Sequence, residues 1–258
     1  IQSRIVGDKI LEAHPDISVT YHTTNAKADM DTSMSISNSG QVGMFTKDIS
    51  KKIINGEFDL AIHSWKDLPI EPSEETEIIG TLERGDFRDI LLIKSETVSL
   101  KQKDEIEILT SSPRRKYNLA KILHDFIPLQ FKSLKFSDVR GNIETRLKKF
   151  KSSEADMIVL AKVALDRLIE YGDRELRGYI KNTLSDNNWL MLPLSVFPTA
   201  PGQGAIAIEA KKNRPRLTEI IKEINCSNTF TSVMKEKKIL SSYGGGCHML
   251  EFEEVKHA

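Results

Sequence analysis

The chain has 258 residues, of which 39% are hydrophobic and 29% are charged, a composition that excludes wholesale disorder. Its 37 basic and 37 acidic side chains cancel, which argues against a protein that binds nucleic acid over its whole surface. No apolar run approaches the roughly 20 residues of a membrane span. The two cysteines cannot form a disulfide framework, and no signal peptide is visible. We therefore expect a cytoplasmic protein that binds neither membranes nor nucleic acid.

Strands and helices alternate along the chain. A helix expected over Lys47–Asn55 ends at Gly56, and Ser112 and Pro113 are typical of the first residues of another helix. The remaining predicted elements are strands at Asp59–Ser64, Glu105–Thr110, Asp156–Ala161 and Gly204–Glu209, and helices at Val163–Ile169, Leu217–Ile224 and Thr229–Ser242. The polar stretch Tyr171–Asn188 is expected to be a loop or insertion. Such alternation predicts a mostly parallel α/β sheet.

Arginines recur where predicted strands end or helices begin. Arg114 and Arg115 fall in the first turn of a helix, where cations oppose the helix dipole unless an anion lies between them. Arg140 and Arg146 flank another helix start, and Arg167 follows a strand. Because the carboxyl ends of strands meet at the ligand crevice of open α/β sheets, these side chains favour a ligand with several carboxylates or phosphates. The alternative is that they face solvent.

The segment Asp59–Asp67 places charge at the end of a strand. Lys66 and Asp67 follow the apolar run, beside Trp65. A carboxylate there could stabilise a developing cation or move a proton, and the alternative is a surface ion pair with Lys66. His63 lies inside the strand and is interpreted as a hydrogen-bonded core histidine.

A glycine run precedes Cys247. Gly244, Gly245 and Gly246 give a flexible backbone, so the thiol could be a nucleophile or an attachment point, or else simply buried. No second pair of ligands stands at metal-binding spacing, so no metal site is predicted. Cys226 is interpreted as structural.

Six motifs, in order along the chain, resemble the porphobilinogen deaminase family. They are His63–Pro69, Arg84–Asp89, Thr110–Arg115, Val139–Asn142 with Thr145–Leu147, Pro201–Ala205 and Gly245–Cys247. The resemblance implies an α/β protein with two periplasmic-binding-protein-like domains and a small α+β C-terminal domain. The implied boundaries are 1–88 with 197–212 for domain 1, 89–196 for domain 2 and 213–258 for domain 3.

The same resemblance implies a reaction and a cofactor. Four porphobilinogen molecules are joined head to tail with loss of ammonia, giving the linear tetrapyrrole hydroxymethylbilane of haem biosynthesis. The implied cofactor is dipyrromethane, held covalently by Cys247, with Asp67 as the catalytic carboxylate. The implied cofactor-binding residues are Lys66, Ser111, Arg114, Arg115, Arg140 and Arg146. Arg146 and Arg167 are the implied substrate-binding residues, and a monomer is expected.

The sequence departs from the family pattern at several places. It begins after the family's first strand, its third domain is expected to be incomplete, and Val42 stands where the family has a basic residue. Two alternatives therefore stay open. One is a non-catalytic two-domain protein that binds a carboxylate- or phosphate-bearing ligand, and the other is an inactive relative.

Overall fold

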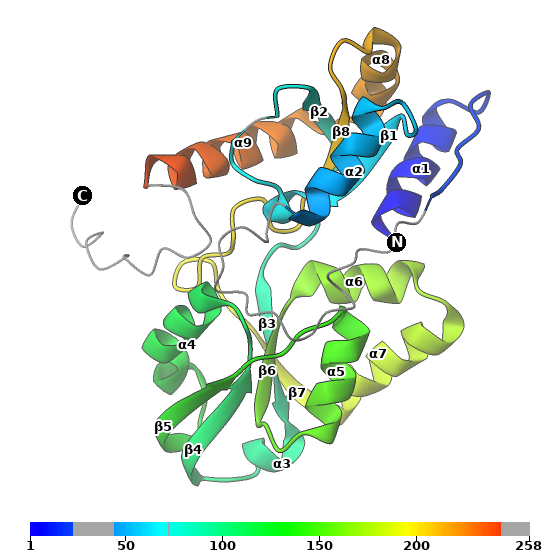
Figure 1. Cartoon of the computed structure of the whole chain (residues 1–258). Coiled ribbons are helices and arrows are strands. Elements are labelled where there is room, and N and C mark those ends of the chain that lie inside the picture. The colour runs from blue at the N-terminus through cyan, green and yellow to red at the C-terminus, as the bar shows by residue number, and fades with distance from the viewer. Residues whose placement is uncertain (23–43, 72, 244–258) are drawn as a thin grey trace. The chain divides into compact units, whose positions relative to one another are not determined.

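A computed structural model describes residues 1–22, 44–71 and 73–243, and divides them into two compact units. Unit 1 contains the described residues of 1–85 and 201–243, and unit 2 contains residues 86–200 (Figure 1). Unit 1 is thus built from two separate stretches of the chain, whereas unit 2 is continuous. Among the described residues, no helix is long and apolar enough to cross a membrane.

Unit 1 has a three-stranded sheet in the order β1-β8-β2. Its elements are α1 (Gln2–Ala13), α2 (Met44–Ile54), β1 (Leu60–Ser64), the 3-10 helix η2 (Trp65–Asp67), β2 (Thr76–Thr81), β8 (Ile206–Lys211), α8 (Pro215–Ile224) and α9 (Ser227–Ser242). Gly56 follows α2 with a φ of 75°, in agreement with its predicted role at the helix end. The assignment of 213–258 to a third domain stays a prediction; the described part of it, α8 and α9, packs within unit 1.

Unit 2 has a five-stranded sheet in the order β5-β4-β6-β3-β7. Its elements are β3 (Asp89–Lys94), α3 (Ser95–Val98), β4 (Gln102–Leu109), α4 (Pro113–Phe126), β5 (Gln130–Ser137), α5 (Ile143–Ser152), β6 (Met157–Ala161), α6 (Lys162–Tyr171), α7 (Arg174–Asp186) and β7 (Asn187–Met191). The predicted α/β class is confirmed.

The prediction of a mostly parallel sheet is wrong. In unit 1, β8 runs antiparallel to both β1 and β2. In unit 2, β4 is parallel to β5 and β6, but β3 is antiparallel to both β6 and β7. The parallel neighbours β4 and β5 are joined through α4, as a crossover connection requires. Strand β8 begins after a long excursion of the chain through unit 2, so no such connection fixes its direction.

Helices cover both faces of the unit 2 sheet. Alternate residues of β3 point to opposite faces, so Leu91 and Ile93 pack in one apolar cluster with α4, while Ile90 and Leu92 pack in another with α5, α6 and α7. Figure 1 shows α4 on one side of these strands and α5 and α7 on the other. Because β3 is buried on both faces, its sequence from Ile90 to Ile93 is an uninterrupted apolar run.

The stretch predicted as a loop, Tyr171–Asn188, is instead helix α7 followed by the first residues of β7. The Asp173 carboxylate caps α7 by accepting from the amide of Leu176 at 2.8 Å. Ile180 is fully buried and Leu176 packs beside it. The apolar residues recur at helical spacing among many polar ones, so average polarity concealed an amphipathic helix.

A buried polar cluster ties together the elements of unit 1. The Glu209 carboxylate lies within hydrogen-bond distance of His63 Nε2 (2.8 Å) and accepts from Thr76 Oγ1 (2.5 Å) and Ser50 Oγ (3.0 Å). Burial raises the pKa of Glu209, but these partners outweigh burial and hold that pKa below its ordinary value. The interpretation of His63 as a hydrogen-bonded core residue is confirmed.

Candidate functional site

The first turn of α4 carries two of the predicted arginines. Ser112 caps the helix by accepting from the Arg115 amide at 3.4 Å, and Pro113 occupies the first helical position. Arg114 and Arg115 therefore lie where the sequence placed them, at the end of a helix that already carries partial positive charge.

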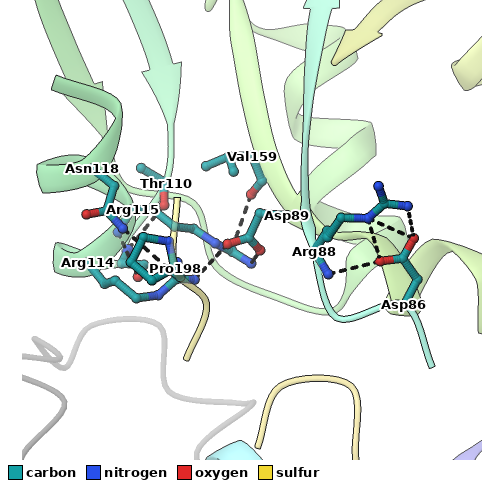
Figure 2. Close-up of polar contacts among 10 residues, drawn as sticks. Asp86, Arg88, Asp89, Thr110, Arg114, Arg115, Asn118, Val159 and Pro198 are labelled. Carbon is teal, nitrogen blue, oxygen red and sulfur yellow. Dashed lines mark hydrogen bonds and ion pairs between the residues drawn. The ribbon is translucent and has the colours of Figure 1, made fainter. Parts of the chain in front are cut away.

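The two arginines converge on one buried carboxylate. Arg114 Nη2 donates to Asp89 Oδ2 at 2.8 Å, and Arg115 Nη2 donates to Asp89 Oδ1 at 2.6 Å. The Asp89 side chain is completely buried, whereas Arg114 keeps 22% of its side chain exposed. Figure 2 shows both guanidinium groups turned toward Asp89, with Arg114 also reaching the carbonyl of Pro198. Asp89, Arg114 and Arg115 form a triad in which the carboxylate offsets one of the two positive charges and leaves the other uncompensated.

Burial and charge compete at this triad. Burial raises the pKa of Asp89, but Arg115 and Arg114 outweigh it and hold that pKa below its ordinary value. Burial lowers the pKa of Arg114, and Asp89 acts in the opposite direction. Within the described residues, the buried Nε of Arg115 has no hydrogen-bond partner. A buried guanidinium nitrogen without an acceptor is rare in folded proteins.

A second pair lies close by in the sequence but differs in its surroundings. Arg88 donates to Asp86 through Nε at 3.0 Å and through Nη2 at 2.7 Å. The Arg88 side chain is 46% exposed, so solvent screens this pair. Figure 2 shows it as a separate cluster beside the triad. The Arg84–Asp89 motif thus contains one partly buried and one fully buried aspartate.

Ser111 connects two loops that carry arginines. Its hydroxyl donates to the carbonyl of Val139 at 3.0 Å and accepts from the Val139 amide at 2.9 Å. This pair of hydrogen bonds joins the start of α4 to the loop that contains Arg140. The hydroxyl proton of Ser111 is thereby used within the protein, which leaves only an oxygen lone pair for a ligand.

The remaining predicted arginines are partly buried. Arg146 Nε donates to the carbonyl of Gly141 at 2.7 Å. Burial lowers the pKa of Arg167 below its ordinary value. Arg140 is half-buried and directly follows the residue held by Ser111. The ligand-binding roles of these residues stay predictions.

Asp67 lies in unit 1, at the end of η2 and directly after β1. Asp67 is exposed. Trp65, the first residue of η2, is 2% exposed and its amide donates to the carbonyl of Ala205 at 3.0 Å. The turn is therefore anchored by Trp65 and presents Asp67 outward, as a catalytic carboxylate would require.

An apolar groove of about 1070 Å³ lies in the same unit, between α2 and α9. Trp65, Leu68, Phe230 and Met234 line it, and Asp67 does not. The groove thus borders the turn on either side of Asp67 without Asp67 in its lining.

The predicted attachment residue, Cys247, lies outside the described residues, as does Val42. The other cysteine, Cys226, stands at the N-terminus of α9, where its sulfur accepts from Thr229 Oγ1 at 3.3 Å. Hydrogen bonds from Thr229 lower the pKa of the Cys226 thiol. Within the described residues, no group of three or more His, Cys, Asp or Glu side chains is placed to hold a metal ion.

Residues 1–219 match the family model described as "Porphobilinogen deaminase, dipyromethane cofactor binding domain". The chain belongs to the porphobilinogen deaminase family. It is 32% identical over 252 residues to the porphobilinogen deaminase of Clostridium novyi (strain NT), covering 96% of this chain and 77% of that relative. It is 34% identical to the enzyme of Caldicellulosiruptor saccharolyticus, with coverage of 96% and 77%.

A likeness to solved structures is weaker. The probable amino-acid ABC transporter extracellular-binding protein YtmK from Bacillus subtilis is 12% identical, with a TM-score of 0.40 over 94% of this chain and 85% of that one. A score this low adds no argument to the family assignment.

The described residues fit the dipyrromethane cofactor of the porphobilinogen deaminase family. The partly exposed Arg114, whose positive charge is not fully offset by the one carboxylate that it shares with Arg115, is suited to the carboxylates that such a group carries. Sequence reasoning assigned no role to Asp89, although it belongs to a motif that carried the resemblance. Its pairing with residues 25 and 26 positions away depends on the fold, and no local pattern could have predicted it.

Proposed function

We propose that this chain joins four porphobilinogen molecules head to tail, with release of ammonia, to form hydroxymethylbilane. Family membership supports this activity and favours it over a non-catalytic binding protein. The single structural observation that carries the proposal is the excess positive charge at the start of α4, where the partly exposed Arg114 and the buried Arg115 share the one carboxylate of Asp89. Such a site binds a carboxylate group of the ligand.

The arginines bind the acidic side chains of the rings. Each pyrrole ring of the substrate carries two carboxylates, so negative charge accumulates as the product grows. Arg114, Arg115, Arg140 and Arg146 bind carboxylates of the cofactor, and Arg146 and Arg167 bind those of the added rings. Lys66 and Ser111 contribute to cofactor binding. The guanidinium group suits this task because it donates two parallel hydrogen bonds to one carboxylate.

Asp67 stabilises positive charge on the substrate. Loss of ammonia leaves an electron-poor ring whose nitrogen carries positive charge, and an ionised carboxylate facing that nitrogen lowers the energy of the step. The same carboxylate can hold the proton that moves to or from the leaving amine. The dipyrromethane cofactor, bound through Cys247, supplies the carbon to which the first ring is joined.

The proposal extends to the state of the protein in the cell. We propose a cytoplasmic monomer that binds no nucleic acid. The equal numbers of basic and acidic side chains support the absence of non-specific binding to nucleic acid.

Intact-protein mass after incubation with porphobilinogen tests the cofactor assignment. We expect an adduct of two pyrrole units on the wild-type chain, its loss in Cys247→Ser and its retention in Cys226→Ser. Cys226 is a demanding control, because its lowered pKa favours the reactive thiolate. An adduct mapped to Cys226, or one that persists in Cys247→Ser, would show that the attachment site is wrong.

A further inference from the structure

A buried lysine contacts the turn that carries Asp67. Lys237, on α9, is only 7% exposed, and its Nζ donates to the carbonyl of Leu68 at 2.9 Å. Lysines normally extend their ammonium group to water, and burial of a charge is unfavourable unless hydrogen bonds compensate it. The ammonium is thus directed at the backbone of the residue that follows Asp67.

Lys237 occupies a position on α9 where an apolar residue is expected. The buried residues Thr229, Val233 and Lys237 are spaced four apart and form one face of the helix. On the same side, Phe230 packs edge-on against Trp65, with ring centroids 5.2 Å apart. An aliphatic side chain at 237 would continue this apolar face at lower desolvation cost, so packing alone does not account for a lysine there.

The hydrogen bond from Lys237 completes the restraint of Leu68. The Leu68 amide donates to the carbonyl of Trp65 at 3.2 Å, and its carbonyl accepts from Lys237. Pro69 follows and restricts Leu68 to the extended conformation that it adopts. With both polar groups of Leu68 held, the backbone on the carboxyl side of Asp67 is fixed.

The amino side of the turn is held by the same helix through a loop. Glu236 Oε2 accepts from the amide of Gly202 at 2.8 Å and pairs with Arg84. Gly202 packs so closely against the backbone of Trp65 and Lys66 that an added Cβ would lie 3.2 Å from the Lys66 nitrogen. Glu236 and Lys237, which are neighbours on α9, therefore restrain the turn on both sides of Asp67.

We propose that Lys237 is a positioning residue for Asp67, which it holds in place through the carbonyl of Leu68. This inference rests on the proposed function. Helix α9 lies beside the sheet of unit 1 and ends at Ser242, shortly before Cys247 in the sequence (Figure 1). One rigid helix thus restrains the turn of the catalytic carboxylate and leads into the segment that carries the attachment cysteine.

Lys237→Met in the full chain loaded with cofactor tests the proposal, with the exposed neighbour Lys238→Met as the matched control. A displacement of about 1 Å can reduce turnover about 100-fold. We expect kcat to fall roughly 10- to 100-fold in Lys237→Met, with KM within about threefold of wild type, because arginines bind the substrate. Cofactor content measured by intact mass should be unchanged, and hydrogen exchange at the Leu68 amide should become faster. Lys238→Met should match wild type in every measurement.

A double-mutant cycle with Asp67→Asn separates positioning from a general structural role. If Lys237 acts through Asp67, adding Lys237→Met to Asp67→Asn should cause little further loss of kcat. Full additivity would overturn the proposal, as would an unchanged kcat in Lys237→Met or failure of that variant to fold. Failure of the proposed function is distinguishable, because wild type and Lys238→Met would then also lack activity.

Discussion

Replacing Asp89 with asparagine removes the charge at the centre of the arginine triad and keeps the size of the side chain. The asparagine oxygen can accept from one arginine, but its amide group directs N–H donors at the other. Breaking a buried ion pair by removing one partner destabilises a protein by about 3–5 kcal/mol, because the remaining charge stays buried without compensation. With Asp89 fully buried and Arg115 8% exposed, we expect a loss in this range.

Asp86→Asn is the matched control, because Asp86 also pairs with an arginine and lies three positions earlier in the same motif. Its partner, Arg88, is 46% exposed, and exposed pairs contribute about 0–1 kcal/mol. Urea unfolding of the full chain, followed by circular dichroism, measures both variants, provided that the m-value is unchanged. A loss below about 1 kcal/mol in Asp89→Asn, or one equal to that of Asp86→Asn, would refute the reasoning.

The pH dependence gives a second measurement on the same variant. The pKa of Asp89 is lowered in the folded state from an ordinary value of 3.8, so the folded protein binds fewer protons at this site than the unfolded chain. The stability that Asp89 contributes is therefore complete above this value and is lost as pH falls through the folded pKa. The difference between wild type and Asp89→Asn should be largest at neutral pH and should shrink below about pH 4.

Two further predictions concern the turn that carries Asp67. Asp67→Asn should reduce single-turnover ammonia release at least about 100-fold, with substrate binding largely retained, and Asp67→Glu should retain more activity than Asp67→Asn. A rate of ammonia release in Asp67→Asn within a few-fold of wild type would leave Asp67 without a catalytic role. Gly202→Ala and Gly56→Ala should each destabilise the protein by about 1–2 kcal/mol, because both glycines have φ near 75°. Gly202→Ala should lower kcat more than Gly56→Ala, because only at Gly202 would the new Cβ press on the turn that carries Asp67. Equal kcat values in these two variants would contradict that reading.

Local patterns in the sequence predicted the helix starts and much of the secondary structure. The cap at Ser112 and the proline at 113 concern neighbouring residues, so the sequence alone places Arg114 and Arg115 in the first turn of α4. The mostly parallel sheet was predicted wrongly because strand pairing joins residues far apart in the sequence, such as Ile62 and Ile208. Helix α7 was missed because polar residues separate its apolar positions, although Leu176 and Ile180 stand at helical spacing.

The candidate site was only partly accessible from sequence for the same reason. Asp67 at the end of a strand and the arginines at helix starts follow from local order along the chain. The buried carboxylate of Asp89 and the ammonium of Lys237 act on residues far away in sequence. Their hydrogen-bond partners can be identified only from the folded structure of each unit.

The position of β8 in the unit 1 sheet has a consequence for synthesis on the ribosome. Strand β8 lies between β1 and β2, yet it is made only after all of unit 2. While the chain is growing, β1 and β2 have no partner strand among the described elements, whereas the continuous unit 2 already has its complete sheet. The unit that begins the chain is thus the later one to fold, the reverse of the usual order. Until Ile206–Lys211 emerges, β1 and β2 lack the strand that pairs with them among the described residues, and their edges are exposed to misassociation.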